Sequence, residues 1–303
     1  MCDKRIVAVF NTTIPLGEAV ARTLAKDTDL HVRAVTSDVT SETALNLKNE
    51  GVELCECSFQ DVDDVITALN SVDECFIVTE TRASDPYCVD NEIKQGRLIA
   101  DACSMSNVNH VIFSTQIHTQ KVKGIQVRPM VTKAEIENYM KDKQLPLSCV
   151  MMPCFYQDFF TIFKPERVQN NTYQFQIPMG LTPIDMIDIE DVGDVIKVML
   201  QDKNKFINKT VRVSGDKITI PELAAILNVN LKPKMFREKL ISVNDYRERD
   251  VIGSKDWANY FNFIQRVDTQ FSVSMTKSLY QDVKSFESWV KVNGDWIMSQ
   301  IAT

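Results

Sequence analysis

The residues whose types and spacing indicate chemistry lie in a loop near the start of the chain. An apolar run at residues 6–10 precedes the loop, and a segment with the spacing of an amphipathic helix follows it. A strand, a tight turn and a helix in this order bind phosphate through backbone N–H groups at the helix start. The turn normally carries glycines, which let the backbone turn sharply and come close to the phosphate. The loop here reads Asn11, Thr12, Thr13, Ile14, Pro15, Leu16 and Gly17.

Two residues of this loop disfavour tight phosphate binding. Ile14 is β-branched, so it does not readily adopt a positive φ, and its side chain occupies space that a phosphate needs. Pro15 has no N–H to donate and biases Ile14 toward an extended backbone. Proline is also common at a helix start for structural reasons alone. The loop therefore predicts either a helix start that no longer binds tightly or a phosphate site of reduced affinity.

The end of the second predicted strand carries Ser37 and Asp38. At this place NAD enzymes use an acid for the ribose hydroxyls, and NADP enzymes use an arginine for the 2′-phosphate. Ser37 supplies neither group. Asp38 lies about one residue beyond the usual place, where an acid more often forms a turn or a helix cap.

A second set of candidate residues follows later strands. Lys133 begins a predicted helix, and the residue four positions before it is Pro129. A tyrosine at that spacing would be the proton donor of a hydride-transfer enzyme, so the sequence predicts no general acid. Lys133 is interpreted either as a ligand of a nicotinamide ribose or as an exposed lysine. The hydroxyls of Thr79, Ser114 and Thr115 end strands, where they can touch a ligand or form turns.

The elements that must position these residues alternate regularly through the first half. Strand-like runs occupy residues 6–10, 31–36, 52–57, 75–79, 110–114 and 147–152, and helical stretches occupy 17–26, 41–50, 61–70, 90–106 and 132–143. Strands separated by helices of this length pair in parallel with right-handed crossovers. Residues 1–155 are therefore predicted to form an α/β domain, a Rossmann-type doubly wound parallel sheet.

The second half, residues 156–303, is predicted to be a smaller mixed α/β region interleaved with the first. Its expected strands are residues 172–178 and 210–213, and its expected helices are 190–200, 220–227 and 278–292. Ligands of doubly wound sheets bind at the carboxyl ends of the strands. We expect this region to wall a cleft there.

Composition and missing motifs exclude several classes of function. The net charge of −7 argues against direct nucleic-acid binding, and no apolar run is long enough to span a membrane. The chain has no G-x-S-x-G elbow and no G-x-x-x-x-G-K-[ST] loop, so hydrolysis and phosphoryl transfer lack support. Its three histidines have no ligand spacing, which predicts no metal site. The chain has eight cysteines, Cys2 among them, and most of them lie in apolar runs. Together with the absence of a signal peptide, they predict reduced thiols and a cytoplasmic protein.

With these residues in view, the chain resembles the NmrA-like family of atypical short-chain dehydrogenases. It is most similar to the animal NADPH-sensor branch, the HSCARG type. The similarity spans nearly the whole chain, including Val20-Ala21-Arg22-Thr23-Leu24, Val32-Arg33, Val35-Thr36, Phe76-Ile77-Val78-Thr79, Lys94-Gln95-Gly96, Lys133 with Glu135 and Glu137, Pro153-Cys154 and Asp191-Val192-Gly193.

The resemblance implies NADP(H) binding, regulation through protein partners, a monomer–dimer change with NADPH, and a place in cytoplasm and nucleus. Thr13, Gly17, Thr79, Lys94 and Lys133 match the family's cofactor positions. The family's G-x-x-G-x-x-G falls on Asn11, Ile14 and Gly17, and its 2′-phosphate arginine falls on Ser37. The absence of an arginine–phosphate interaction costs about 1.5–3 kcal/mol. The resemblance therefore implies a weakened or vestigial NADP(H) site.

Three functions remain open on the sequence. The first is a non-catalytic regulatory protein with a vestigial or weak NADP(H) site. The second is a sensor that still binds NADP(H), with Asn11, Thr12 and Thr13 as substitute donors. The third is an NAD(P)H-dependent reductase with an unrecognised acid, such as Tyr139 or Tyr156.

Overall fold

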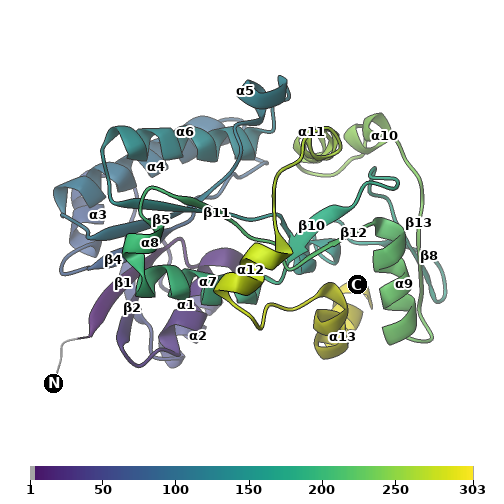
Figure 1. Ribbon diagram of the computed structural model, residues 1–303, viewed down its shortest axis with the longest axis horizontal. Coiled ribbons are helices and arrows are strands. Elements are labelled where there is room, and N and C mark those ends of the chain that lie inside the picture. The colour runs from purple at the N-terminus through teal and green to yellow at the C-terminus, as the bar shows by residue number, and fades with distance from the viewer. Residues whose placement is uncertain (1–3, 303) are drawn as a thin grey trace. The chain divides into compact units, whose positions relative to one another are not determined.

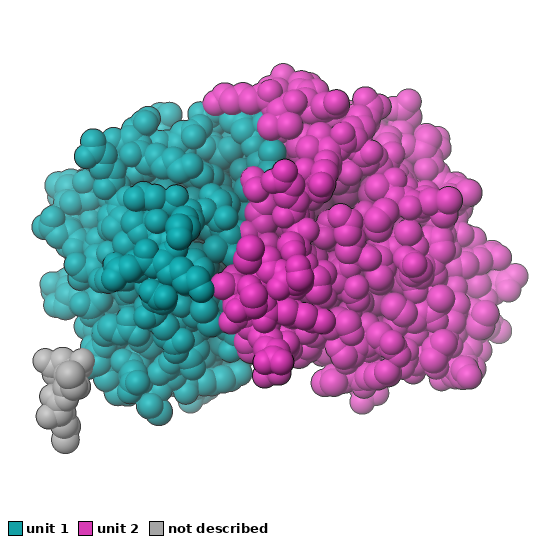
Figure 2. All heavy atoms as spheres, in the orientation of Figure 1, with its two compact units in different colours: residues 1–118, 128–151, 189–211 teal, residues 119–127, 152–188, 212–303 magenta. Residues whose placement is uncertain are grey.

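The computed structural model describes residues 4–302, so Cys2 lies outside the described residues. The chain divides into two compact units, which Figure 2 colours separately. The first unit comprises residues up to 118 together with 128–151 and 189–211. The second comprises residues 119–127, 152–188 and the chain from 212 onward. The prediction that the second half walls a cleft stays a prediction.

The first unit is built on a seven-stranded sheet with the strand order β11-β6-β5-β4-β1-β2-β3. All neighbours from β3 to β6 pair in parallel, and the order reverses between β1 and β4. This confirms the predicted Rossmann-type doubly wound sheet. Its elements are β1 (Arg5–Phe10), α1 (Pro15–Ala25), β2 (Leu30–Thr36), α2 (Glu42–Asn49), β3 (Glu53–Glu56), α3 (Val62–Ala68), β4 (Glu74–Ile77), α4 (Cys88–Met105), β5 (His110–Thr115), α6 (Arg128–Asp142), β6 (Leu147–Met151), α7 (Ile189–Gln201), α8 (Lys203–Phe206) and β11 (Thr210–Arg212).

Helices cover both faces of this sheet, as the continuous apolar strands require. Helices α4 and α6 pack together on one face, and α1 packs against α7 on the other (Figure 1). The close approach of α1 and α7 depends on Gly193, because a Cβ there would lie 2.5 Å from the Cβ of Thr23. The buried strand positions Ala8 and Phe10 belong to the core beneath α4 and α6.

The second unit holds two three-stranded sheets, β12-β10-β7 and β13-β9-β8. Its aromatic core includes Tyr156, Phe261 and Trp289. The elements are α5 (Thr119–Lys123), β7 (Cys154–Phe155), a 3₁₀ helix (Tyr156–Phe159), β8 (Glu166–Gln169), β9 (Thr172–Phe175), β10 (Ile184–Ile187), β12 (Asp216–Ile218), α9 (Ile220–Asn230), β13 (Met235–Glu238), α10 (Val243–Arg247), α11 (Ser254–Ile264), α12 (Val273–Leu279) and α13 (Phe286–Ala302).

One predicted element of this half is wrong. The amphipathic stretch 278–292 is not a single helix, because α12 ends at Leu279 and α13 begins at Phe286. Ser285 starts the new helix, since its hydroxyl accepts a hydrogen bond from the backbone N–H of Ser288 at 3.2 Å. Within residues 4–302, no helix is both long and apolar enough to cross a lipid bilayer.

Candidate functional site

The loop after β1 turns at Asn11, which has a φ of 56°. Asparagine is one of the few residues besides glycine that adopt this left-handed conformation at low cost. The backbone N–H of Ile14 donates to the carbonyl of Asn11 at 3.1 Å and closes the turn. The positive φ of the loop is therefore at Asn11 and is tolerated there.

The conformation of Ile14 corrects one expectation and confirms another. Ile14 has φ −93° and ψ 150°, so the predicted penalty from a positive φ at this residue does not arise. The extended backbone is the one that Pro15 favours, and Pro15 stands in the first turn of α1 as expected. Two features still disfavour phosphate binding, namely the bulk of the Ile14 side chain and the missing N–H of Pro15.

Gly17 is required by the close contact of α1 with this turn. A Cβ at this position would lie 2.4 Å from the carbonyl oxygen of Asn11, which is too close for any side chain. This confirms the predicted packing role of Gly17. Leu16 and Gly17 are buried and Pro15 is exposed, and none of the three lines the pocket described below.

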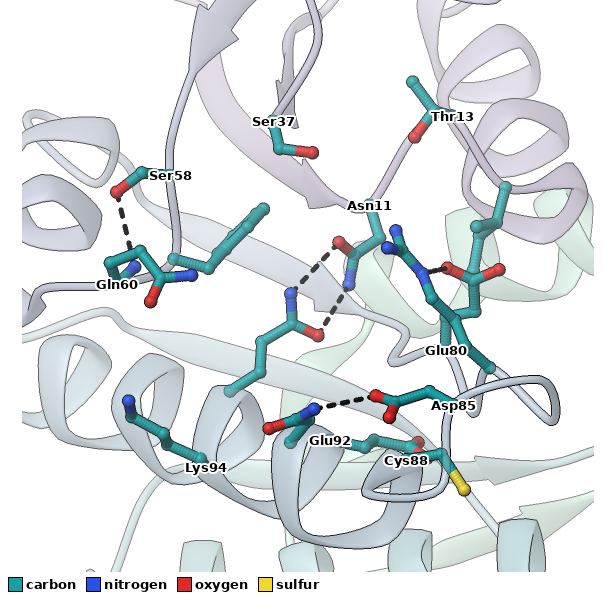
Figure 3. Close-up of a pocket in the computed structure, with 15 residues that line it drawn as sticks. Asn11, Thr13, Ser37, Ser58, Gln60, Glu80, Asp85, Cys88, Glu92 and Lys94 are labelled. Carbon is teal, nitrogen blue, oxygen red and sulfur yellow. Dashed lines mark hydrogen bonds and ion pairs between the residues drawn. The ribbon is translucent and has the colours of Figure 1, made fainter.

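The side chain of Asn11 joins the turn to the rest of the unit. Its Nδ2 donates to the carbonyl of Val78, just after β4, at 2.6 Å. Its amide also faces the amide of Gln95 on α4, with N–O distances of 3.5 and 3.4 Å (Figure 3). Both the Nδ2 and the Oδ1 atoms of Asn11 thus face protein groups.

A pocket of about 410 Å³ lies at the carboxyl ends of the strands, beside the reversal in strand order (Figure 3). This is the size range and the place in which doubly wound sheets bind nucleotides. Its walls come from the loops after β1, β2, β3 and β4 and from the first turns of α4. The lining residues are Asn11, Thr13, Ile14, Ser37, Ser58, Phe59, Gln60, Glu80, Arg82, Asp85, Cys88, Asn91, Glu92, Lys94 and Gln95.

The structure brings five predicted cofactor residues together in this pocket: Asn11, Thr13, Ile14, Ser37 and Lys94. Thr12 does not line it. The Thr12 side chain is fully buried, and its hydroxyl has no hydrogen-bond partner within residues 4–302. The carboxylate of Asp38 accepts hydrogen bonds within its own loop, as expected for an acid that forms a turn. Hydrogen bonds from the hydroxyl and the N–H of Thr40 lower the pKa of Asp38.

Thr79 and Lys133 meet at a buried carboxylate that sequence reasoning missed. Glu92 on α4 is 2% exposed and accepts hydrogen bonds from Thr79 at 2.6 Å and from Thr81. Lys133 on α6 donates to the same Glu92 at 2.7 Å. The signal available in the sequence is the spacing of Glu92 with Gly96, Ile99 and Cys103, the buried stripe of α4.

The two alternative acids are held elsewhere. The hydroxyl of Tyr139 donates to the carboxylate of Asp101 at 2.9 Å, and that of Tyr156 donates to the carbonyl of Lys284 at 2.8 Å. Neither tyrosine lines the pocket. Ser114 and Thr115 are buried at the end of β5, where Thr115 donates to Glu137 at 2.6 Å.

No metal chemistry is indicated in the described part of the chain. Residues 4–302 hold no group of three or more His, Cys, Asp and Glu side chains placed to bind a metal ion. The seven cysteines of this range, Cys55, Cys57, Cys75, Cys88, Cys103, Cys149 and Cys154, are free thiols.

The sequence matches the model of the NmrA-like family over residues 3–290. A Dictyostelium discoideum NmrA-like family domain-containing protein is 25% identical over 233 residues, which cover 73% of this chain and 76% of that protein. The NmrA-like family domain-containing oxidoreductase notA of an Aspergillus species is 25% identical over 243 residues, 73% of this chain and 71% of that protein.

Solved structures show the same fold. NmrA, a negative transcriptional regulator, in complex with NAD has a TM-score of 0.81 and 19% identity over 95% of this chain and 94% of NmrA. The complex of NmrA with NADP has a TM-score of 0.80 and 20% identity over the same shares. Triphenylmethane reductase of Citrobacter sp. with NADP(H) has a TM-score of 0.74 and 15% identity over 95% of this chain and 99% of that protein.

Proposed function

Because the chain belongs to the NmrA-like family, we propose that it is a non-catalytic regulatory protein of the redox-sensor type. It binds NADP(H) weakly in the pocket at the carboxyl ends of β1 to β4 and acts through protein partners. A change between monomer and dimer, a cytoplasmic and nuclear location, a role in transcriptional regulation and closeness to the animal NADPH sensors are parts of this proposal.

The observation that carries the proposal is the ion pair of Lys133 with Glu92. In a hydride-transfer enzyme of this type the lysine lowers the pKa of a nearby phenol, which then gives up its proton. Here Lys133 donates to a buried carboxylate at 2.7 Å. Pro129 takes the place of the phenol, and Tyr139 and Tyr156 lie outside the pocket.

The surroundings of the turn support weak rather than tight binding. Ile14 forms part of the pocket wall, and the side chain of Asn11 is hydrogen-bonded to Val78 and Gln95. Ser37 lines the pocket, and it occupies the sequence position at which NADP enzymes of this fold carry the arginine for the 2′-phosphate. The missing guanidinium and the obstructed turn together cost about 3–4 kcal/mol, and each 1.4 kcal/mol lowers affinity about tenfold. A site of about 1 μM affinity would then bind NADPH with an expected dissociation constant of about 0.1–1 mM.

A reductase is the second candidate, because notA is named an oxidoreductase and triphenylmethane reductase has the same fold. Calorimetric titration of the whole chain with NADPH and NADH separates weak binding from none. Oxidation of NADPH in the presence of a panel of carbonyl compounds and quinones tests catalysis. The proposal expects weak heats of binding and no oxidation above the rate without protein, and substrate-dependent oxidation would replace it with the reductase.

A further inference from the structure

The loop after β4 brings an arginine into a pocket whose β2 end has a serine in place of a phosphate-binding arginine. Arg82 lines the pocket together with Asn11, Thr13 and Ser37, the residues of the turn and of the β2 end. Ser37 carries a short hydroxyl and no charge. Arg82 and Lys94 are the cations among the described residues that line this pocket.

The guanidinium of Arg82 has donors to spare. Its Nε donates to the carboxylate of Glu80 at 2.9 Å (Figure 3). The terminal Nη1 and Nη2 make no hydrogen bond with any residue in the described range 4–302. A guanidinium held through Nε presents its two terminal nitrogens as a fork, the geometry that matches two oxygens of a phosphate.

Two other arginines of the first unit are committed to protein groups. Arg33 on β2 donates to Glu53 and to the carbonyls of Ala68 and Asn70. Arg22 pairs with Glu18 and Glu50. Neither side chain can turn to a ligand without breaking these interactions.

The acids of the pocket are largely engaged, which limits their repulsion of a phosphate. Glu92 is paired with Lys133, and Glu80 is paired with Arg82 itself. Asp85 accepts hydrogen bonds from the N–H of Tyr87 and from Asn91. The ammonium of Lys94 has no ion-pair partner among the described residues, so it adds to the positive charge that faces the pocket.

We propose that Arg82 binds a phosphate of the adenine dinucleotide and so supplies, from the β4–α4 loop, the guanidinium that Ser37 cannot provide. This rests on the proposed function, because it requires that the pocket takes NAD(H) or NADP(H). The phosphate is either the pyrophosphate, which both dinucleotides carry, or the 2′-phosphate, which NADP alone carries.

The test is a calorimetric titration of the whole chain with NAD⁺ and with NADP⁺, for wild type, Arg82→Gln and Arg97→Gln. Arg97→Gln is the matched control, because it also removes one arginine charge. Arg97 is on α4, lies over the ring of Tyr139 and does not line the pocket. The Arg82 side chain is 70% exposed, so its replacement is expected to leave the melting temperature unchanged. We expect Arg82→Gln to weaken binding about tenfold, the effect of removing one charge-assisted hydrogen bond, and Arg97→Gln to have no effect.

The pattern across ligands assigns the phosphate. Equal losses of affinity for NAD⁺ and NADP⁺ identify the pyrophosphate, and a larger loss for NADP⁺ identifies the 2′-phosphate. If wild type binds and both variants bind as tightly as wild type, the proposed role of Arg82 is wrong and the proposed function stands. If wild type binds neither dinucleotide at millimolar concentration, both are wrong.

Discussion

Lys133 Nζ lies 2.7 Å from Glu92 Oε1, and this ion pair joins α6 to α4 beside the pocket. The Glu92 side chain is fully buried and that of Lys133 is 14% exposed. The ammonium of Lys133 is therefore held by a carboxylate of the protein, which balances its charge without a ligand.

Replacing Glu92 with glutamine is expected to destabilise the protein by about 3 kcal/mol. The substitution leaves the ammonium of Lys133 mostly buried without its counter-charge, which is the costly way to break such a pair. Urea unfolding of the variant measures the change. The exposed pair of Glu287 and Lys291 provides the control, because Glu287→Gln is expected to change stability by less than about 0.5 kcal/mol. Equal effects of the two substitutions would show that the pair at Glu92 is not a buried one.

Replacing Gly17 with alanine is expected to cost about 1–3 kcal/mol, because the new methyl group would meet the Asn11 carbonyl at 2.4 Å. Gly294→Ala is the control. A Cβ there would lie 3.3 Å from the flexible end of Leu231, so its cost is expected to stay below about 1 kcal/mol. Thermal or urea unfolding compares the two. A Gly17→Ala protein as stable as wild type would mean that α1 and the turn are not in close contact.

The stability of the second unit is expected to depend on pH through Asp158. Burial raises the pKa of Asp158 to about 7, although the N–H of Phe155 donates to its carboxylate and opposes this. The folded state then holds a proton that the unfolded state releases near pH 4, so unfolding free energy falls as pH rises from about 4 to about 7.

The Asp158→Asn variant tests this dependence, because asparagine keeps an acceptor for Phe155 and cannot ionise. Urea unfolding of both proteins from about pH 4 to about pH 8 gives the difference in their stabilities. The variant is expected to gain on wild type as pH rises and to stop gaining above about pH 7. A difference that stays constant over this range would contradict the raised pKa.

Local patterns in the sequence are sufficient to predict strands β1 to β6 and their parallel pairing. They do not reveal that β11 joins the same sheet or which distant residues pair. The apolar runs that form β1 to β6 and the small residue at Gly17 follow from periodicity and backbone sterics. The site depends on pairs that lie far apart in the chain, such as Glu92 with Lys133 and Asn11 with Val78. No spacing rule links such residues, because the fold alone brings them together.

Two differences between prediction and structure have local physical causes. The stretch 278–292 keeps a helical pattern across residues 280–285, and this pattern hides the cap at Ser285 that restarts the helix. The positive φ expected at Ile14 occurs instead at Asn11, where it costs little, because the turn places its left-handed residue directly after β1. In both cases a turn-forming or capping residue decides the structure.

The central claim is that the residues of the turn and of the β2 end make NADP(H) binding weak. Titration of NADPH into wild type and into the Asn11→Gly/Ile14→Gly/Ser37→Arg variant tests it most directly. The account predicts that the variant binds at least about tenfold more tightly, because the β2 end gains a guanidinium of its own and the turn is no longer obstructed. A variant that binds no better than wild type, or a wild-type chain that already binds NADPH stoichiometrically at low micromolar concentration, would contradict the claim.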